Sequence, residues 1–375
     1  MKKILIDVNS IIIRRGETHL SGIGRSTLDL LTALAKLENI PFQIQLFYQG
    51  SNPNALESYK LPFPVLYIPL PFSDKYVKLI AQMRLKELLS CYDLLHIVHN
   101  YSIVAKPKKT LVTIHDAMFF SYPENFLGHE RARETYPVLA KACKGIITCS
   151  ASSKRDIVQY MSVSEGKITV APWCVSKELF YPETDIQITS IKEKYQVKKT
   201  FFIMVSCDIG RKNTISLLRA FRLYKEKGGK YDLVLVWGNP PTEYLTEFAD
   251  LINENRVFFL KHLSEVDLRG LYSGAIASFF PSKYEGFGLP ILESMACGTP
   301  VVTCRNSSLE EVGGKMAFYT EPDDLEMMAK YMIDFESGKY DLLEIKQQLL
   351  NYSDDFSWEK TALTYVEFYK KHLGL

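Results

Sequence analysis

The chain has 375 residues, of which 47% are hydrophobic and 23% charged, and its formal net charge is +2 at pH 7. This length accommodates about two domains, and the composition excludes disordered, collagen-like and disulfide-stapled proteins. No window offers the roughly 20 uninterrupted apolar residues that a membrane span needs. The seven cysteines are scattered and never spaced as Cys-x-x-Cys, which is typical of reduced thiols, so we expect a cytoplasmic protein.

Positive charge is concentrated in the first half of the chain. Residues 1–185 carry 22 Lys and Arg against 17 Asp and Glu, whereas the remaining residues carry 23 against 26. A basic excess favours contact with an anionic partner. We therefore expect the first half to meet something negatively charged.

Short apolar runs rich in Val, Ile and Phe alternate with longer amphipathic stretches along the chain. The runs at 200–206 and 232–237 are apolar on both faces, as parallel strands covered by helices are. Amphipathic helices are expected at 24–37, 214–226 and 264–273. This alternation predicts an α/β protein with doubly wound parallel sheets. The predicted strands are 3–8, 43–48, 64–69, 93–98, 110–115, 145–149, 168–171, 200–206, 232–237, 257–260, 276–280, 300–304 and 316–320.

A polar stretch at 174–199 interrupts the alternation before a new strand begins. We place the connection between two domains there, with the first domain at 1–185 and the second at 186–356. The tail at 357–375 is predicted to be a helix with Ser357 as its N-cap. Because ligands of open parallel sheets bind at the carboxyl ends of the strands, the chemistry is expected at those ends.

The stretch at 281–300, PSKYEGFGLPILESMACGTP, joins a predicted strand to a predicted helix through a glycine loop. Gly286 and Gly288 lie in the loop, Pro290 lies near the first helical position, and Gly298 stands where the helix ends. Such a junction presents backbone N–H groups and the positive end of a helix dipole to an anion, typically phosphate. The stretch is therefore a candidate phosphate site.

Two glutamates border this candidate site. Glu285 precedes the loop and Glu293 lies about one helical turn beyond it, with seven residues between them. Their carboxylates are placed to accept hydrogen bonds from hydroxyl groups on either side of the phosphate. Taken singly, Glu293 could instead favour the helix dipole, and Glu285 could be a surface carboxylate.

The string EGFGLPILE resembles the Glu-x7-Glu signature of the retaining GT-B glycosyltransferases grouped as glycosyltransferase family 4, and ACGTPVV resembles the segment directly after the signature in that family. The resemblance covers nearly the whole chain and is weakest in the stretch 40–100. Further matching strings are Ile114–His115–Asp116, IITCSASSKRDI at 146–157, Arg211–Lys212–Asn213 and Phe356–Ser357–Trp358.

The resemblance implies a GT-B fold, in which two Rossmann-like domains face each other across a cleft and the C-terminal helix returns to the first domain. It assigns the acceptor to the first domain and the nucleotide sugar to the second. It implies transfer of a sugar from a nucleotide-diphosphate sugar to an acceptor hydroxyl with retention at the anomeric carbon, in bacterial surface polysaccharide or glycolipid assembly. Front-face displacement and a covalent intermediate on a carboxylate such as Glu285 both stay open.

A metal or cofactor is not expected. The sequence contains no Asp-x-Asp motif, the motif that holds the metal-bound diphosphate in GT-A transferases. Its histidines and cysteines never adopt a metal-ligand spacing. We therefore expect catalysis without a divalent cation, with the nucleotide sugar as a substrate.

The resemblance also implies the residues of the donor site. Glu293 would hold the ribose hydroxyls, and Glu285 would contact the transferred sugar near its anomeric carbon. Lys212, with Arg211 beside it, would neutralise the diphosphate leaving group as its charge grows. The sugar hydroxyls and the β-phosphate would be bound by the backbone amides of Gly286, Phe287, Gly288 and Leu289.

One position departs from the family. Many members have an arginine six residues before the lysine, where this chain has Ser206. Arg211 either supplies the missing charge or is a solvated surface residue.

Two further elements of the site are implied in the first domain. Gly22 and Gly24, in a segment between the first predicted strand and helix, would bring the backbone close to phosphates or the acceptor; a plain pair of turn glycines is the alternative. His115 would lie against the donor sugar and stabilise positive charge at the anomeric carbon, with Asp116 orienting the loop. A structural histidine at a strand end is the alternative.

Two other functions fit a GT-B chain. One is an epimerase or phosphorylase-like enzyme that breaks or rearranges its sugar nucleotide, although no pyridoxal-phosphate lysine context is visible. The other is a non-catalytic subunit that binds sugar nucleotide. Loss of either glutamate or of the lysine would favour such a subunit, and Glu285, Glu293 and Lys212 are all present.

The expected partners are a UDP- or GDP-linked sugar and a saccharide or lipid-linked saccharide acceptor, with no nucleic acid. A candidate amphipathic helix at 71–89 would let the protein lie on the inner membrane face through its basic residues. An ordinary core-packed helix and a soluble acceptor are the alternative. The basic residues of that helix are Lys75, Lys78, Arg84 and Lys86, and Lys106, Lys108 and Lys109 add charge in the same half.

Overall fold

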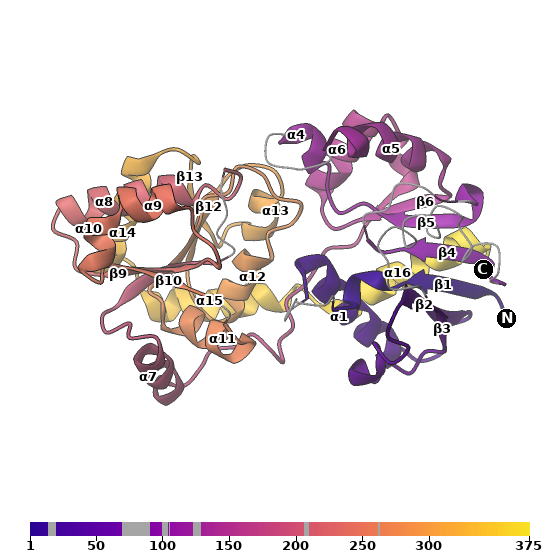
Figure 1. Ribbon diagram of the computed structural model, residues 1–375, viewed down its shortest axis with the longest axis horizontal. Helices are drawn as coiled ribbons and strands as arrows, with labels where there is room; N and C mark the ends of the chain where they lie inside the picture. The colour runs from indigo at the N-terminus through magenta and orange to yellow at the C-terminus, as the bar shows by residue number, and fades with distance from the viewer. Residues whose placement is uncertain are drawn as a thin grey trace. The chain divides into compact units, whose positions relative to one another are not determined.

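The structure of the protein, a computed structural model, describes residues 1–13, 20–69, 91–99, 104, 106–122, 129–205, 210–261 and 263–375. These residues form two compact units, each built on its own parallel sheet (Figure 1). The first unit comprises Met1–Cys174 and Ser357–Leu375, and the second comprises Val175–Phe356. The predicted α/β class with two parallel sheets is confirmed.

The sheet of the first unit has the strand order β3-β2-β1-β4-β5-β6-β7. Because the order runs outward from β1 in both directions, the switch point of the sheet lies between β1 and β4. The strands are β1 (Lys3–Asp7), β2 (Gln43–Gly50), β3 (Val65–Pro69), β4 (Leu94–Ile97), β5 (Thr110–Thr113), β6 (Gly145–Thr148) and β7 (Ile168–Val170). The α-helices are α1 (Gly22–Lys36), α4 (Met118–Ser121), α5 (His129–Ala142), α6 (Ala151–Met161) and α16 (Trp358–Leu373).

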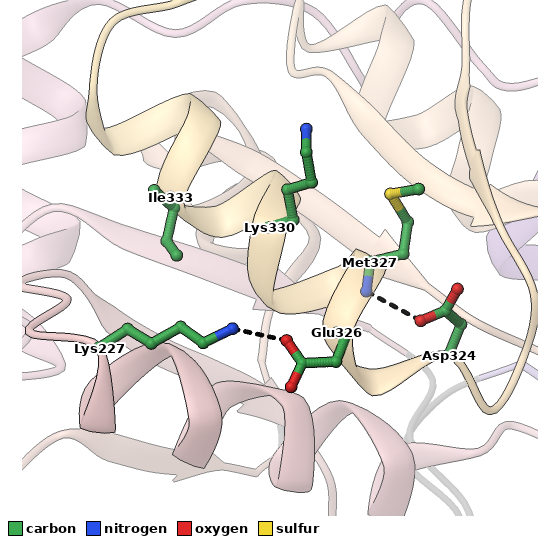
Figure 2. Close-up of a pocket in the computed structure, with 6 residues that line it drawn as sticks. All are labelled: Lys227, Asp324, Glu326, Met327, Lys330 and Ile333. Carbon is green, nitrogen blue, oxygen red and sulfur yellow. Dashed lines mark hydrogen bonds and ion pairs between the residues drawn. The ribbon is translucent and has the colours of Figure 1, made fainter.

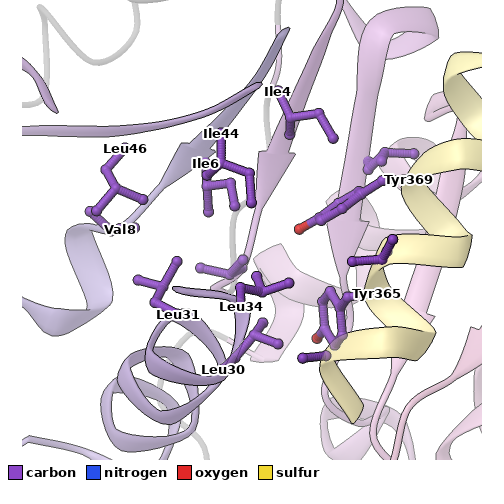
Figure 3. Packing of buried hydrophobic residues seen from close by; sticks show 14 of the residues in the cluster. Ile4, Ile6, Val8, Leu30, Leu31, Leu34, Ile44, Leu46, Tyr365 and Tyr369 are labelled. Atoms are coloured by element: carbon purple, nitrogen blue, oxygen red, sulfur yellow. The ribbon is translucent and has the colours of Figure 1, made fainter. Parts of the chain in front are cut away.

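Both faces of this sheet are apolar, because helices cover each of them. On one face, Ile4 and Ile6 of β1 pack against α1 and α16, and Figure 3 shows Leu30 of α1 and Tyr365 of α16 in this core. On the other face, Leu5 packs in a core with α5 and α6. The alternation within β1 therefore has the period of two that a strand imposes.

Helix α16 is fixed to the first unit by a buried hydrogen-bond network as well as by packing on α1. The Tyr369 hydroxyl lies 2.7 Å from Nδ1 of His96, and Nε2 of His96 lies 3.0 Å from Oγ1 of Thr113. Burial lowers the pKa of His96 to about 3, so this ring is neutral. At the start of the helix, the Ser357 side chain accepts a hydrogen bond from the Glu359 N–H, which confirms the predicted N-cap.

The sheet of the second unit has the strand order β10-β9-β8-β11-β12-β13. Its strands are β8 (Phe201–Met204), β9 (Asp232–Val236), β10 (Val257–Leu260), β11 (Ala277–Phe280), β12 (Val301–Cys304) and β13 (Phe318–Thr320). Its helices are α7 (Asp185–Lys194), α8 (Thr214–Glu226), α9 (Thr242–Glu247), α10 (Ala249–Asn253), α11 (Glu265–Gly274), α12 (Leu289–Ala296), α13 (Leu309–Gly313), α14 (Leu325–Glu336) and α15 (Leu342–Asp354). Every strand predicted from the sequence is present in one of the two sheets, close to its expected bounds.

The two units divide after Cys174, inside the stretch 174–199 that was predicted to connect them and before the predicted bound at 185. The same stretch contains α7. Thr184 caps this helix by accepting a hydrogen bond from the Gln187 N–H. The sequence did not predict the helix because Ile191 is its single buried residue, so it has almost no apolar periodicity.

The predicted basic helix at 71–89 lies outside the described residues. Lys106, Lys108 and Lys109 are exposed and precede β5, so they lie at the amino-terminal edge of the first sheet. Among the helices that the structure describes, none combines the length and the apolar character that crossing a membrane requires.

Candidate active site

The glycine loop of the second unit lies between β11 and α12, as the sequence predicts. Gly288 is the N-cap of α12 and has a φ of +104°, a conformation that a residue with a Cβ rarely adopts. A Cβ at Gly288 would also lie 3.0 Å from Cδ2 of Leu309. Leu289 is the first residue of the helix, and Pro290 lies in its first turn. Proline is favourable there because backbone N–H groups of the first turn have no carbonyl partner within the helix.

Two serines from the β12–α13 loop hold the glycine loop in place. The Ser308 hydroxyl lies 2.9 Å from the carbonyl oxygen of Glu285 and 2.8 Å from that of Phe287. The Glu285 N–H donates to Oγ of Ser307 at 3.0 Å. Phe287 is buried and packs edge-on against Phe356. The backbone around Gly286 is therefore fixed from both sides.

A compact charge cluster lies immediately before this loop. Oε1 of Glu285 lies 2.7 Å from Nη1 of Arg211 and 2.7 Å from Nζ of Lys212. The Ser282 hydroxyl donates to the same oxygen at 2.6 Å. The side chains of Arg211, Lys212 and Glu285 are only 17%, 12% and 10% exposed. Two cations thus share one carboxylate, which leaves a net positive charge in a sheltered position.

Opposing effects set the protonation of Glu285. Burial raises the pKa of its carboxyl group, but the charges of Lys212 and Arg211 and the hydrogen bond from Ser282 outweigh burial and hold the pKa below its ordinary value. Glu285 is therefore ionised at neutral pH. Lys212 also lies over the Phe280 ring, with Nζ 4.8 Å from the ring centroid, which further limits its freedom.

The turn that carries the two cations is fixed by Asn213. This residue has a φ of +60° and is the N-cap of α8, and its buried amide donates to the carbonyls of Pro281 and Pro322 at 3.2 and 2.5 Å. Arg211 donates from Nη1 to the Tyr284 carbonyl at 2.8 Å. These contacts exclude a freely solvated Arg211. Ser206, where the family pattern has an arginine, lies outside the described residues.

Glu293 lies in α12, and its carboxylate has a partner from a different helix. The hydroxyl of Tyr272 in α11 donates to Oε2 of Glu293 at 3.0 Å. Tyr272 is fully buried, whereas Glu293 is half-buried. Glu285 and Glu293 therefore flank one helix N-terminus, as the spacing predicts, and each is held by partners distant in sequence.

In the first unit, His115 lies just beyond the end of β5. Its Nε2 lies 3.0 Å from the Val98 carbonyl, so this nitrogen carries the proton. Burial lowers the pKa of His115 to about 4, and the ring is neutral. The ring packs against Trp173 with centroids 5.2 Å apart, and its buried Nδ1 has no hydrogen-bond partner among the described residues. The backbone carbonyl of His115 accepts from Sγ of Cys149 at 3.2 Å.

Asp116 follows His115 in the turn after β5. Its Oδ1 accepts the N–H of Met118 at 2.9 Å, which fixes the turn after His115. At the switch point of this sheet, Oδ1 of the buried Asp7 lies 3.1 Å from Nε2 of His99. The sequence has no pattern that would pair these last two residues.

The glycines after β1 are placed differently from the prediction. Gly22 and Gly24 lie in the first turn of α1, not before it, because Ser21 is the N-cap and accepts the Gly24 N–H at 3.1 Å. A Cβ at Gly24 would lie 2.5 Å from the Ser10 carbonyl oxygen, whereas one at Gly22 would meet nothing within 4 Å. Close packing against Ser10 therefore requires a glycine at position 24. The roles expected of Gly22 and Gly24 at the phosphates or the acceptor both stay predictions.

The predicted site residues do not line the surface pocket that Figure 2 shows. This pocket has a volume of about 340 Å³ and lies beside α14, where Lys227 pairs with Glu326 at 2.5 Å. Its other lining residues are Asp324, Met327, Lys330 and Ile333. Within the described ranges, no group of three or more His, Cys, Asp or Glu side chains is arranged to hold a metal ion.

Family models match a large part of each unit of the chain. The family model described as Glycosyltransferase Family 4 matches residues 20–179, and the one described as Glycosyl transferases group 1 matches residues 185–353. The chain is 26% identical over 378 residues to O-antigen chain mannosyltransferase B of Escherichia coli, covering 94% of this chain and 96% of that one. It is 30% identical over 217 residues to O-antigen chain mannosyltransferase RfbU of Salmonella typhimurium, covering 57% of each.

A similar fold is known among solved structures. The Anabaena protein HepE, solved in complex with UDP and glucose, superposes with a TM-score of 0.73 at 19% identity, covering 99% of this chain and 100% of that one. At this identity the likeness concerns the fold.

Proposed function

The chain belongs to glycosyltransferase family 4 and has a GT-B fold, and from this premise we propose that it is a retaining, metal-independent transferase that moves a hexosyl unit from a nucleotide-diphosphate sugar to an acceptor hydroxyl. The cluster of Glu285, Arg211 and Lys212 beside the N-terminus of α12 carries the proposal. Departure of a nucleoside diphosphate concentrates negative charge, which fixed cations and helix dipoles stabilise. Retention is supported by the Glu-x7-Glu string.

In the proposed reaction the bond between the anomeric carbon and the β-phosphate oxygen breaks, and a bond from that carbon to the acceptor oxygen forms. The O–H bond of the acceptor breaks as well, and its proton passes to the departing diphosphate. Lys212 and Arg211 stabilise the departing diphosphate, while the carboxylate of Glu285 lies next to the sugar that becomes positively charged. Glu293 binds the ribose. The neutral ring of His115 brings no opposing positive charge to the sugar, so it suits the role proposed for it.

The donor sugar that we propose is mannose, because both curated relatives named above are mannosyltransferases. Their names also place them in O-antigen chain synthesis, which supports an acceptor in surface polysaccharide assembly. We propose a saccharide acceptor that is lipid-linked and met at a membrane surface, as the basic excess in the first half of the chain favours. The nucleotide that we propose is a uridine or a guanosine diphosphate.

One experiment separates this function from its rivals. The protein is incubated with UDP- and GDP-linked mannose and glucose, with and without short mannose-containing acceptors, and the products are analysed by NMR. A new glycosidic bond with the anomeric configuration of the donor is the expected result. Isomerised donor without transfer would support the epimerase alternative, and binding without turnover would support a non-catalytic subunit.

Transfer is expected to survive removal of divalent cations. Lys212 and Arg211 already supply the positive charge that a metal ion supplies elsewhere, so incubation with EDTA should change kcat by less than about twofold. The initial rate is measured before chelation, after chelation and after magnesium is restored. Loss of activity that magnesium restores would contradict the metal-independent mechanism.

Removing the carboxylate of Glu293 is expected to weaken nucleotide binding. Glu293→Ala deletes hydrogen bonds from two ribose hydroxyls to a charged acceptor, so the Kd for the nucleoside diphosphate should rise by about tenfold to a hundredfold. Isothermal titration calorimetry measures this change. The control is Glu310→Ala, which removes an exposed carboxylate paired with Arg305 in the same unit. An unchanged Kd in Glu293→Ala would remove Glu293 from the donor site.

A further inference from the structure

The hydroxyl of Tyr272 is the buried partner of Glu293. Tyr272 lies in α11, its side chain is fully buried, and its hydroxyl donates to Oε2 of Glu293 at 3.0 Å. A phenol hydroxyl without a partner in such a place would be costly, so the bond constrains both side chains. It joins two helices at positions 21 residues apart in the sequence.

Tyr272 is itself held from two sides. Its backbone carbonyl accepts the hydroxyl of Thr299 at 2.6 Å, and its ring packs edge-on against Phe180 with centroids 6.2 Å apart. Because the side chain cannot move toward a displaced carboxylate without losing this packing, it defines where Oε2 of Glu293 lies.

The helix that carries Tyr272 is also anchored. Arg269, one turn earlier in α11, is buried and donates from Nε to Oε1 of Glu183 at 2.6 Å and from Nη1 to the Leu179 carbonyl at 3.0 Å. Its guanidinium lies over the Tyr181 ring, 4.0 Å from the centroid. The segment after Cys174 therefore clamps α11 in place, and Tyr272 is presented to Glu293 from a rigid element.

We propose that Tyr272 is a positioning residue that orients the Glu293 carboxylate toward the two neighbouring hydroxyls of a ribose. This orientation gives the donor site its preference for ribonucleoside over 2′-deoxyribonucleoside diphosphates. A carboxylate that can rotate binds one hydroxyl at a time, whereas one whose Oε2 is held can accept two hydrogen bonds from a diol. This inference rests on the donor role proposed for Glu293.

The test compares Tyr272→Phe with a matched control, Tyr224→Phe. Tyr224 is also fully buried in a helix of the second unit and donates its hydroxyl to a carboxylate, that of Glu336. Its ring packs against Phe202 and Phe221, which lie outside the proposed site. Calorimetry measures the Kd values of UDP, GDP and their 2′-deoxy forms for each variant, and transfer assays measure KM and kcat.

Tyr272→Phe is expected to raise the Kd of the ribonucleoside diphosphate by about tenfold, as loss of one hydrogen bond to a charged group does, and that of the 2′-deoxy form by less than about twofold. The KM for the donor should rise while kcat stays nearly constant. Tyr224→Phe should leave the ratio of the two Kd values unchanged even if it lowers stability.

Several results would overturn the inference. Equal weakening of ribo and deoxy forms in Tyr272→Phe would show a merely structural tyrosine, and unchanged Kd values for both forms would show that Glu293 needs no positioning. If wild-type protein binds neither UDP nor GDP, the donor role itself is wrong and the inference falls with it. A large effect of Glu293→Ala with none from Tyr272→Phe would contradict only the role of Tyr272.

A second variant covers the case in which Tyr272→Phe does not fold. Glu293→Gln keeps an oxygen that can accept the Tyr272 hydroxyl, so it should retain part of the preference for ribonucleotides, whereas Glu293→Ala should lose all of it. Equal ratios in these two variants would contradict the proposal.

Discussion

Replacing Lys212 with methionine is expected to lower kcat of sugar transfer by two to three orders of magnitude, a loss of about 3–4 kcal/mol of transition-state stabilisation. Methionine keeps most of the side-chain volume and its contact with Phe280 while it removes the charge. The negative charge on the diphosphate grows as the bond to the sugar breaks. Lys212 should therefore matter more to the transition state than to the bound donor, and the donor Kd should rise by about tenfold or less.

Lys283→Met is the control for this prediction. Lys283 lies in the same loop as Glu285 but pairs with Asp323 at 3.0 Å on the surface. Its replacement should change kcat by less than about twofold. Single-turnover measurements with saturating donor separate chemistry from binding. Equal losses in kcat and in donor affinity for Lys212→Met would mean that Lys212 only binds the diphosphate.

Glu285→Gln is expected to lower the rate of sugar transfer by at least about a hundredfold. It is also expected to lower the free energy of unfolding by about 3 kcal/mol. Glutamine keeps the shape of the side chain and can still accept the Ser282 hydroxyl. It removes the charge that Arg211 and Lys212 share and leaves two sheltered cations facing each other. A diphosphate can replace that charge, so we expect UDP or GDP to raise the melting temperature of this variant more than that of the wild type.

The stability effect has a defined dependence on pH. Because the folded-state pKa of Glu285 lies below its ordinary value of 4.5, its ionised form contributes stability that is fully present above that value. This contribution is lost as the pH falls through the folded pKa. The difference in unfolding free energy between wild type and Glu285→Gln should therefore be largest at neutral pH and shrink below pH 4.5.

Urea denaturation at a series of pH values measures this difference. Glu310→Gln is the control, because Glu310 pairs with Arg305 at an exposed position and should change stability by no more than about 1 kcal/mol. A constant difference between wild type and Glu285→Gln across the acidic range would show that the carboxylate is not held ionised by its two cations.

Much of this protein could be predicted without coordinates. Buried parallel strands such as Phe201–Met204 are apolar on both faces, so their positions are visible as continuous apolar runs. The junction at 281–300 was visible because each local requirement has its own residue type: Gly288 for a positive φ, Pro290 for the first helical turn and Gly298 for the helix end. These are local properties of the backbone, and sequence records them directly.

Other features of local structure were hidden by weak patterns. Helix α7 buries only Ile191, so its period did not stand out from the polar segment around it. Gly24 resembled a loop residue, but it lies in the first turn of α1, where the Ser10 carbonyl leaves no room for a Cβ. A glycine can serve a turn or a close contact, and its neighbours in sequence do not distinguish the two.

The contacts that give the candidate site its chemistry were decided by the tertiary structure. Arg211 and Lys212 meet Glu285 because β8 and β11 are adjacent in the sheet although they are far apart in the sequence. Tyr272 reaches Glu293 because α11 and α12 lie side by side. The sequence by itself determined which residue types stand at the strand ends and helix starts. The order of the strands decided which of these residues lie close enough to share a carboxylate. Pairing across a sheet depends on long-range packing, which the local periodicity of the sequence does not show.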